Sequence, residues 1–220
     1  MKSRTAAPAR SADTETAILE AARDLLAEGG LGALSMRGVA ARVGVSATAI
    51  YNYFENKQAL VKRVVTQGFE RFAGYLRGAI ADVPVGSAER LRALGEAYIR
   101  FALENREYFR VIFASHAETP QDIEELPEGG GYELFRQTVV DAMESGAIRE
   151  ADADLVVLYL WAHVHGLVTL LLTCEPDARC EHTGRRLSAP ELFARFSEFV
   201  LYGLRPDGAV RAETGSAAAS

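Results

Sequence analysis

The fold of this chain is decided by residues 34–57, which read LSMRGVAARVGVSATAIYNYFENK. Ser35 is a suitable N-cap, because its hydroxyl can accept a hydrogen bond from the first turn of a helix. Apolar residues at helical spacing follow it, and Gly44 stands where a left-handed residue commonly ends a helix. Ser46 is a second N-cap and begins a second helix, Ala47–Phe54. This order predicts a helix-turn-helix, whose second helix enters the major groove of DNA.

The two sides of this second helix predict different roles. Ile50 and Phe54 are four residues apart and therefore lie on the same side of the helix, which we expect to pack against the core. Thr48 and Asn52 point the opposite way, and short polar side chains suit base edges. Lys57 follows the helix, where its charge would meet a backbone phosphate. The residues that we expect to contact DNA are Ser35, Met36, Arg37, Ser46, Ala47, Thr48, Ala49, Tyr51, Asn52, Tyr53 and Lys57.

Residues 34–60 resemble the DNA-binding region of the TetR (tetracycline repressor) family. The resemblance is strong over residues 14–65 and elsewhere concerns mainly the helical architecture. It implies a homodimeric transcriptional regulator, more often a repressor than an activator, that a small-molecule ligand releases from a palindromic operator in double-stranded DNA. It also implies that the ligand shifts the helix that follows the helix-turn-helix. The residues that carry it are Gly44-Val45-Ser46, Tyr51, Tyr53-Phe54, Lys57 and Leu60.

The apolar periodicity of the chain predicts an all-α protein of about nine helices, with no convincing strand. We expect a flexible N-terminal arm at 1–12, a DNA-binding domain at 13–62, a helical ligand-binding and dimerisation domain at 63–205, and a disordered tail at 206–220. Ser188 and Glu191 form a capping box with Pro190 in the first turn of the last helix. The expected helices are 13–28 (stopped by Gly29 and Gly30), 36–43, 47–54, 56–83, 88–104, a short one from 105, 132–145, 153–173 and 189–204.

Charge and cysteine content favour a cytoplasmic DNA-binding protein. The net charge is −6, but residues 1–80 hold 11 Lys/Arg and 7 Asp/Glu, whereas residues 81–220 hold 13 and 23. A basic end would turn toward DNA and an acidic body away from it, although a chance fluctuation remains an alternative. The two cysteines form no disulfide framework, and the first residues carry no secretory signal.

Residues 155–172 are almost wholly apolar, which raises the question of a membrane span. A helix that is apolar on all sides also arises when one side faces its own core and the other a partner subunit. We favour this second interpretation, with the last two helices of two subunits forming a four-helix bundle and no membrane contact. The expected interface residues are Leu158, Ala162, Thr169, Leu170, Phe196, Val200 and Leu204.

Within this apolar run, residues 161–166 read WAHVHG. They resemble the signature of a TetR-type effector domain named for a Trp, a His and a Gly, with Trp161, His165 and Gly166 as the matches. One interpretation places Trp161 and His165 at a ligand cavity; the other makes His165 a core histidine and Gly166 a helix-packing contact. We expect a small apolar ligand of unknown identity, in a cavity lined by Tyr98, Phe101, Phe109, Phe113, Met143, Trp161 and His165.

Enzyme and cofactor motifs are absent from the sequence, since it has no dinucleotide-binding, phosphate-loop, nucleophile-elbow or zinc-protease signature. We therefore expect no enzyme, no cofactor and no metal. His163 and His165 diverge by about 200° on a helix, which disfavours shared chelation. Cys174, Cys180 and His182 match no common zinc pattern, and zinc or a redox disulfide stays open beside ordinary thiols. A helical small-molecule or metal sensor without DNA activity is the alternative function.

Overall fold

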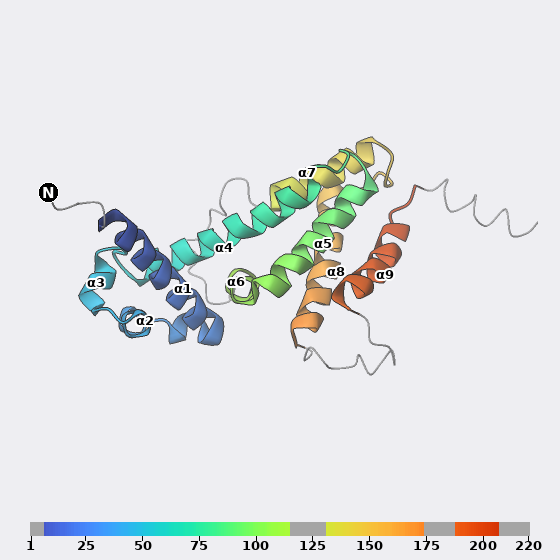
Figure 1. The fold of residues 1–220 in the computed structure, drawn as a ribbon. Coiled ribbons are helices and arrows are strands. Elements are labelled where there is room, and N and C mark those ends of the chain that lie inside the picture. Colours follow the sequence, from blue (N-terminus) through green and yellow to red (C-terminus); the bar gives the residue numbers. More distant parts are fainter. Residues whose placement is uncertain (1–6, 115–130, 174–187, 207–220) are drawn as a thin grey trace, which may run out of the picture. The chain divides into compact units, whose positions relative to one another are not determined.

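The computed structural model describes residues 7–114, 131–173 and 188–206, shown as coloured ribbons in Figure 1. Outside these residues lie residues 1–6 of the expected arm at 1–12, the segment with Cys174, Cys180 and His182, and the tail beyond 206. In the described residues every regular element is helical, as the all-α prediction requires. The elements are α1 (Ala7–Ala33), α2 (Met36–Val43), α3 (Ala47–Tyr51), α4 (Lys57–Ile80), α5 (Ala88–Glu104), α6 (Arg106–Phe109), the π-helix η1 (Arg110–Ala114), α7 (Gly131–Glu144), α8 (Ala153–Thr173) and α9 (Ala189–Tyr202).

Local hydrogen bonds set the ends of the helix-turn-helix. The Ser35 hydroxyl accepts from the backbone N–H of Gly38 at 3.0 Å, so α2 begins where the sequence predicts. Gly44 ends α2 in the left-handed conformation, with φ 78°, which a residue without a side chain adopts without strain. The Ser46 hydroxyl then accepts from the backbone N–H of Ala49 at 3.2 Å and begins α3.

Two helices in this region differ from the sequence prediction. Helix α3 ends at Tyr51 rather than at Phe54, because the N–H of Asn52 bonds back to Ala49 and tightens the chain into a turn. Helix α1 begins at Ala7, well before the predicted start at residue 13, so the second half of the expected arm is helical. The sequence predicts that the first helix is interrupted at Gly29 and Gly30, and the backbone is non-helical at both residues.

The chain forms two compact units whose boundary differs from the predicted one after residue 62. The described residues of the first unit are 7–71 and 105–114, and those of the second are 72–104, 131–173 and 188–206. Helix α4 is therefore shared, and α6 with η1 belongs to the first unit. Gly68 explains this packing: a Cβ placed there would lie 2.7 Å from Ile112 Cγ2, so α4 and η1 approach closely only because Gly68 has none.

The second unit is a bundle in which α5 contacts α7, α8 and α9 (Figure 1). A capping box between Ser188 and Glu191 begins α9, as predicted. Helix α8 is long and apolar enough to span a bilayer, and it is the one such helix among the residues described. One side of α8 packs instead into the core of the unit, through residues that include Val157 and Val168.

Candidate functional site

Helix α3 presents the predicted recognition surface on the first unit. Ile50 is fully buried and Phe54 nearly so, and together they hold the short helix against the core. Thr48, Tyr51 and Asn52 are exposed on the outer side. This arrangement leaves a threonine hydroxyl and methyl, a phenol and a carboxamide available to a duplex, which are groups that contact base edges and phosphates.

The remaining predicted DNA-contacting residues divide by exposure. Ser35, Arg37 and Ser46 are exposed at the starts of α2 and α3, whereas Ala47, Ala49 and Tyr53 are half-buried. Met36 is buried in the core of the unit, so its side chain presents little surface to DNA and its DNA contact stays a prediction. It occupies the first position of α2, where a side chain that turns back toward the preceding helix is covered.

Lys57 is half-buried at the start of α4, and its ammonium group donates a hydrogen bond to the backbone carbonyl of Leu31. This bond joins α4 to the last turn of α1, beyond the break at Gly29 and Gly30. An ammonium group has three donors, so one bond to a carbonyl is compatible with a second bond to a phosphate. Lys57 thus has a structural role that the sequence did not reveal.

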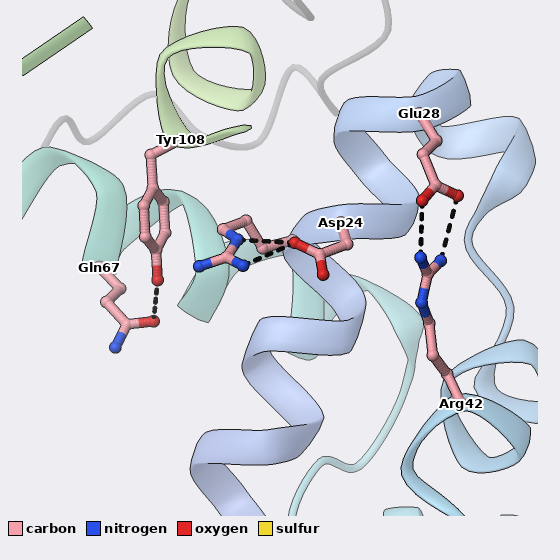
Figure 2. Close-up of polar contacts among 6 residues, drawn as sticks. Asp24, Glu28, Arg42, Gln67 and Tyr108 are labelled. Atoms are coloured by element: carbon pink, nitrogen blue, oxygen red, sulfur yellow. Dashed lines mark hydrogen bonds and ion pairs between the residues drawn. The ribbon is translucent and has the colours of Figure 1, made fainter. Parts of the chain in front are cut away.

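An exposed ion pair connects α2 to α1. Arg42 on α2 donates two hydrogen bonds, at 2.7 and 3.0 Å, to the carboxylate of Glu28 near the end of α1 (Figure 2). These hydrogen bonds lower the pKa of Glu28, but both side chains are solvent-exposed, so the pair adds little to stability. Its main effect is to fix the direction of Arg42, which therefore points toward α1.

Tyr108 on α6 contacts residues of α1 and α4 in the first unit. Its hydroxyl donates to the side-chain carbonyl of Gln67 on α4 at 2.8 Å (Figure 2). The guanidinium of Arg23 on α1 lies 5.2 Å from the centre of the Tyr108 ring, and that of Arg71 lies 5.7 Å from it. Partial burial lowers the pKa of Arg23, but the hydrogen bonds and charge of Asp24, together with Tyr108 and Glu107, outweigh burial and raise that pKa above its ordinary value. The ring thus lies against two cations, an attractive arrangement.

Three of the predicted ligand-contacting residues meet in the second unit. The Tyr98 hydroxyl on α5 lies 2.8 Å from Nδ1 of His165 on α8, and the indole N–H of Trp161 donates to the same hydroxyl at 3.3 Å. Tyr98 is buried, His165 is half-buried and Trp161 is 40% exposed. The structure therefore favours neither of the two interpretations of this segment alone, because His165 has a protein partner and is also partly accessible.

The other predicted lining residues do not all join this cluster. Phe101 is connected to it through Phe72, whose ring centre lies 5.2 Å from that of Phe101 and 5.3 Å from that of Tyr98. Met143 instead packs against the hydrophobic cluster that contains Val139. Phe109 and Phe113 lie in the first unit with their ring centres 4.9 Å apart, because α6 and η1 pack with that unit.

The second unit also carries an exposed apolar surface on α8 and α9. Of the residues predicted for the dimer interface, Leu158, Ala162, Thr169 and Leu170 are exposed and Phe196 is half-buried. Val200 and Leu204 are buried within their own subunit and present little surface to a partner, so their place in the interface stays a prediction. The exposed apolar residues that the sequence did not single out are Leu155, Tyr159, Phe199 and Tyr202, and Gly166 lies exposed among them.

Metal-binding groups do not gather in the described part of the chain, where no cluster of three His, Cys, Asp or Glu side chains could hold an ion. His163 lies against the rings of Tyr159 and Phe196, at 4.1 and 5.9 Å between ring centres, and its Nδ1 is 2.6 Å from the Tyr159 carbonyl. These contacts place His163 in the packing between α8 and α9.

Two family comparisons agree with this architecture. Residues 18–64 match the bacterial regulatory proteins of the tetR family, and residues 91–179 match the tetracyclin repressor-like C-terminal domain. The chain belongs to the TetR family. The predicted helix-turn-helix regulator is therefore confirmed at the level of the family, whereas the Trp-His-Gly subtype of the effector domain stays a prediction.

Individual relatives match at low identity. The HTH-type transcriptional regulator UidR of Escherichia coli is 31% identical over 70 residues, which span 32% of this chain but only 36% of that protein. The HTH-type transcriptional repressor KstR2 of Mycolicibacterium smegmatis is 24% identical over 159 residues, 70% of this chain and 77% of that protein. A solved protein of unknown function from Rhodococcus is 27% identical, with a TM-score of 0.70 over 87% of this chain and 95% of that one.

Proposed function

We propose that this TetR-family protein is a cytoplasmic, sequence-specific repressor that binds a palindromic operator as a homodimer and leaves it when a small apolar ligand binds. The observation that carries the proposal is the outer face of α3. Thr48, Tyr51 and Asn52 are exposed there on a helix that Ser46 caps and that Ile50 anchors. A short helix held in this way has a fixed direction, which base recognition requires.

Dimerisation follows from the reach of one such helix. Helix α3 has five residues and can read only a few base pairs, so affinity and specificity need two copies on one site. The exposed apolar surface of α8 and α9 offers an interface for a second copy. We assign to it Leu158, Ala162, Thr169, Leu170 and Phe196 from the sequence, with Leu155, Tyr159, Phe199 and Tyr202 added.

The ligand response would use the two connections between the units. Helix α4 runs through both units without a break, and α6 directly follows α5 in the chain while it packs with the DNA-binding unit. Tyr108 ties α6 to α1 and α4, so a displacement of the end of α5 would be passed to the helix-turn-helix. The ligand can change operator affinity only as far as it binds the two conformations differently.

A selection from random oligonucleotides with the purified full-length protein tests the proposal. We expect a two-fold symmetric site, with half-sites about one helical turn or a multiple of it apart. Absence of any enriched site would refute the function, and an asymmetric single site would refute the dimer on DNA.

Variants of the recognition face then separate reading from positioning. Thr48→Ala and Asn52→Ala should change the selected sequence, because they remove groups that face the bases. Lys57→Ala should weaken binding to all sequences alike and reduce the salt slope by about one unit. Because Lys57 also bonds to Leu31, its variant needs a parallel measurement of stability. Identical effects of all three variants would contradict the assignment of roles.

A further inference from the structure

His163 lies beside the exposed apolar surface of α8 and α9 that we propose as the dimer interface. Residues three, four or seven positions apart share one side of a helix, so His163 shares a side of α8 with Tyr159, Gly166 and Leu170. All three of these residues are exposed. Toward α9, the imidazole lies against the ring of Phe196, with 5.9 Å between the ring centres. A partner that covers this surface would therefore cover the exposed part of His163.

A hydrogen bond determines which nitrogen of His163 can take up a proton. Nδ1 lies 2.6 Å from the backbone carbonyl of Tyr159, and because a carbonyl oxygen can only accept, Nδ1 carries the proton of the neutral ring. The bare nitrogen is then Nε2, which has no hydrogen-bond partner among the residues that the structure describes. In a separate subunit the ring is only half-buried, so water can bring a proton to Nε2 and can accept the hydrogen bond of the new N–H.

The side chains around His163 provide no negative charge to balance a protonated ring. In the described part of the chain, no Asp or Glu forms a hydrogen bond or an ion pair with it. The titratable group in contact with it is Tyr159, whose ring centre lies 4.1 Å away and attracts a cation equally with or without a partner. On α9 the charged residues Glu191, Arg195 and Glu198 are all exposed, and on α5 and α7 Arg92 and Arg136 pair with Glu96 and Asp154.

A covering partner would therefore affect the two protonation states of His163 differently. The neutral ring loses little, because its Nδ1 bond lies within its own subunit. The protonated ring would bring a charge into an apolar contact without a negative partner, and its new N–H would lose the water that accepts from it. The dimer then binds protons less readily than two separate subunits do. By linkage, the dimer is favoured where His163 is neutral and is weakened as the pH falls through the range in which a histidine takes up its proton.

We propose that His163 makes dimerisation, and with it operator binding, sensitive to pH: the protein is a dimer at neutral pH and separates when His163 is protonated under mildly acidic conditions. The inference rests on the proposed function, because that function assigns the dimer interface to α8 and α9. Each dimer covers two copies of His163, so the effect on the dissociation constant is the product of two equal contributions.

Sedimentation of the full-length protein between about pH 7.5 and about pH 5.5 tests the proposal. We expect the dissociation constant of the dimer to rise about tenfold or more over this range, since each of two imidazoles loses part of its proton affinity. Dilution calorimetry at about pH 6, in two buffers of different ionisation enthalpy, measures the protons exchanged. The wild-type protein should take up protons as its dimer dissociates. Circular dichroism at each pH shows whether the subunits stay folded.

Two uncharged variants remove the proton site and keep different contacts of the ring. His163→Asn retains an N–H that can donate to the carbonyl of Tyr159, and His163→Phe retains an aromatic ring beside Tyr159 and Phe196. Both should dimerise with less than about a twofold change in dissociation constant over the same pH range, and neither should take up protons. His165→Gln is the matched control, because His165 is also half-buried but lies about 200° around α8. It should respond to pH as the wild type does.

The outcomes distinguish a failure of this inference from a failure of the proposed function. A wild-type dimer that is equally tight at both pH values, that dissociates without proton uptake, or that responds to pH just as His163→Asn does would overturn the inference and leave the proposed dimer intact. A wild-type protein that is monomeric at neutral pH and binds no operator would overturn the proposed function, and the inference with it.

Discussion

Gly68 on α4 is the position where a single methyl group tests the packing of the DNA-binding unit. A Cβ at this position would lie 2.7 Å from Ile112 Cγ2 and 3.2 Å from Tyr108 Cδ1, both well inside ordinary van der Waals contact. Ile112 is 1% exposed and Tyr108 3%, so neither has open space into which it can move. Gly68→Ala should therefore force η1 and α6 away from α4.

The expected change in stability is the difference between two opposing terms. Alanine is more favourable than glycine inside a helix by about 1 kcal/mol. Overpacking of a buried contact costs about 1–3 kcal/mol, and the 2.7 Å approach of a buried branched side chain places Gly68→Ala toward the upper end. We expect the free energy of unfolding to fall by about 1–2 kcal/mol.

The same helix supplies matched controls. Gly74 and Gly78 also lie within α4, and a Cβ added at either position would have no other atom within 4 Å. Gly74→Ala and Gly78→Ala should each raise the free energy of unfolding by up to about 1 kcal/mol, because only the helix preference changes. Urea denaturation of the three variants measures both signs. A Gly68→Ala protein as stable as the wild type would refute the close packing of α4 on η1.

Three further predictions each concern a single residue. Ser46→Ala removes the hydroxyl that accepts a hydrogen bond from the N–H of Ala49. We expect the free energy of unfolding to fall by about 1 kcal/mol and operator binding to weaken. Unchanged binding would show that α3 needs no cap. Gly166→Leu places a bulky side chain on the proposed interface, and sedimentation should show monomers, whereas an intact dimer would place the interface elsewhere. Hydrogen bonds from Arg136 lower the pKa of Asp154 in the folded protein. Ionised Asp154 therefore stabilises the fold at pH values above the ordinary carboxyl pKa, and this contribution is lost as the pH falls through the lowered pKa of the folded state. Asp154→Asn should reduce the melting temperature at neutral pH and not at about pH 2; an equal loss at both would exclude the ion pair as its cause.

The elements that the sequence predicts best are those whose ends depend on neighbouring residues. Ser35, Ser46 and Ser188 each bond to a backbone N–H three residues on, and Gly44 needs only its own backbone freedom. Such contacts depend on a few adjacent residues, so residue type and spacing suffice to place them. The outward side of α3 is predicted for the same reason, because Ile50 fixes which side of a short helix faces the core.

Contacts between distant residues could not be predicted in this way. The Tyr108 hydroxyl bonds to Gln67, 41 positions away, and this contact exists because Gly68 admits η1 against α4. Helical periodicity describes α6 as a continuation of the effector domain, since it follows α5 directly. The sequence therefore places Phe109 and Phe113 in the ligand cavity, whereas they lie in the first unit with α6 and η1.

The hydrophobic pattern of α8 does not predict which of its residues face the core. Because it is apolar on all sides, no polar side marks the direction of solvent, and the sequence cannot say which leucines face the core. On the neighbouring α9 the sequence prediction names Val200, which is 8% exposed, whereas Phe199 beside it is 79% exposed. Phe199 on α9 and Leu158 and Leu170 on α8 are each more than half exposed, and so many exposed apolar side chains on two helices in contact are unfavourable in water. The burial pattern of one subunit thus supports the proposed second copy on α8 and α9 more directly than the sequence does, and it adds Phe199 and Tyr202 to the residues that a partner would reach.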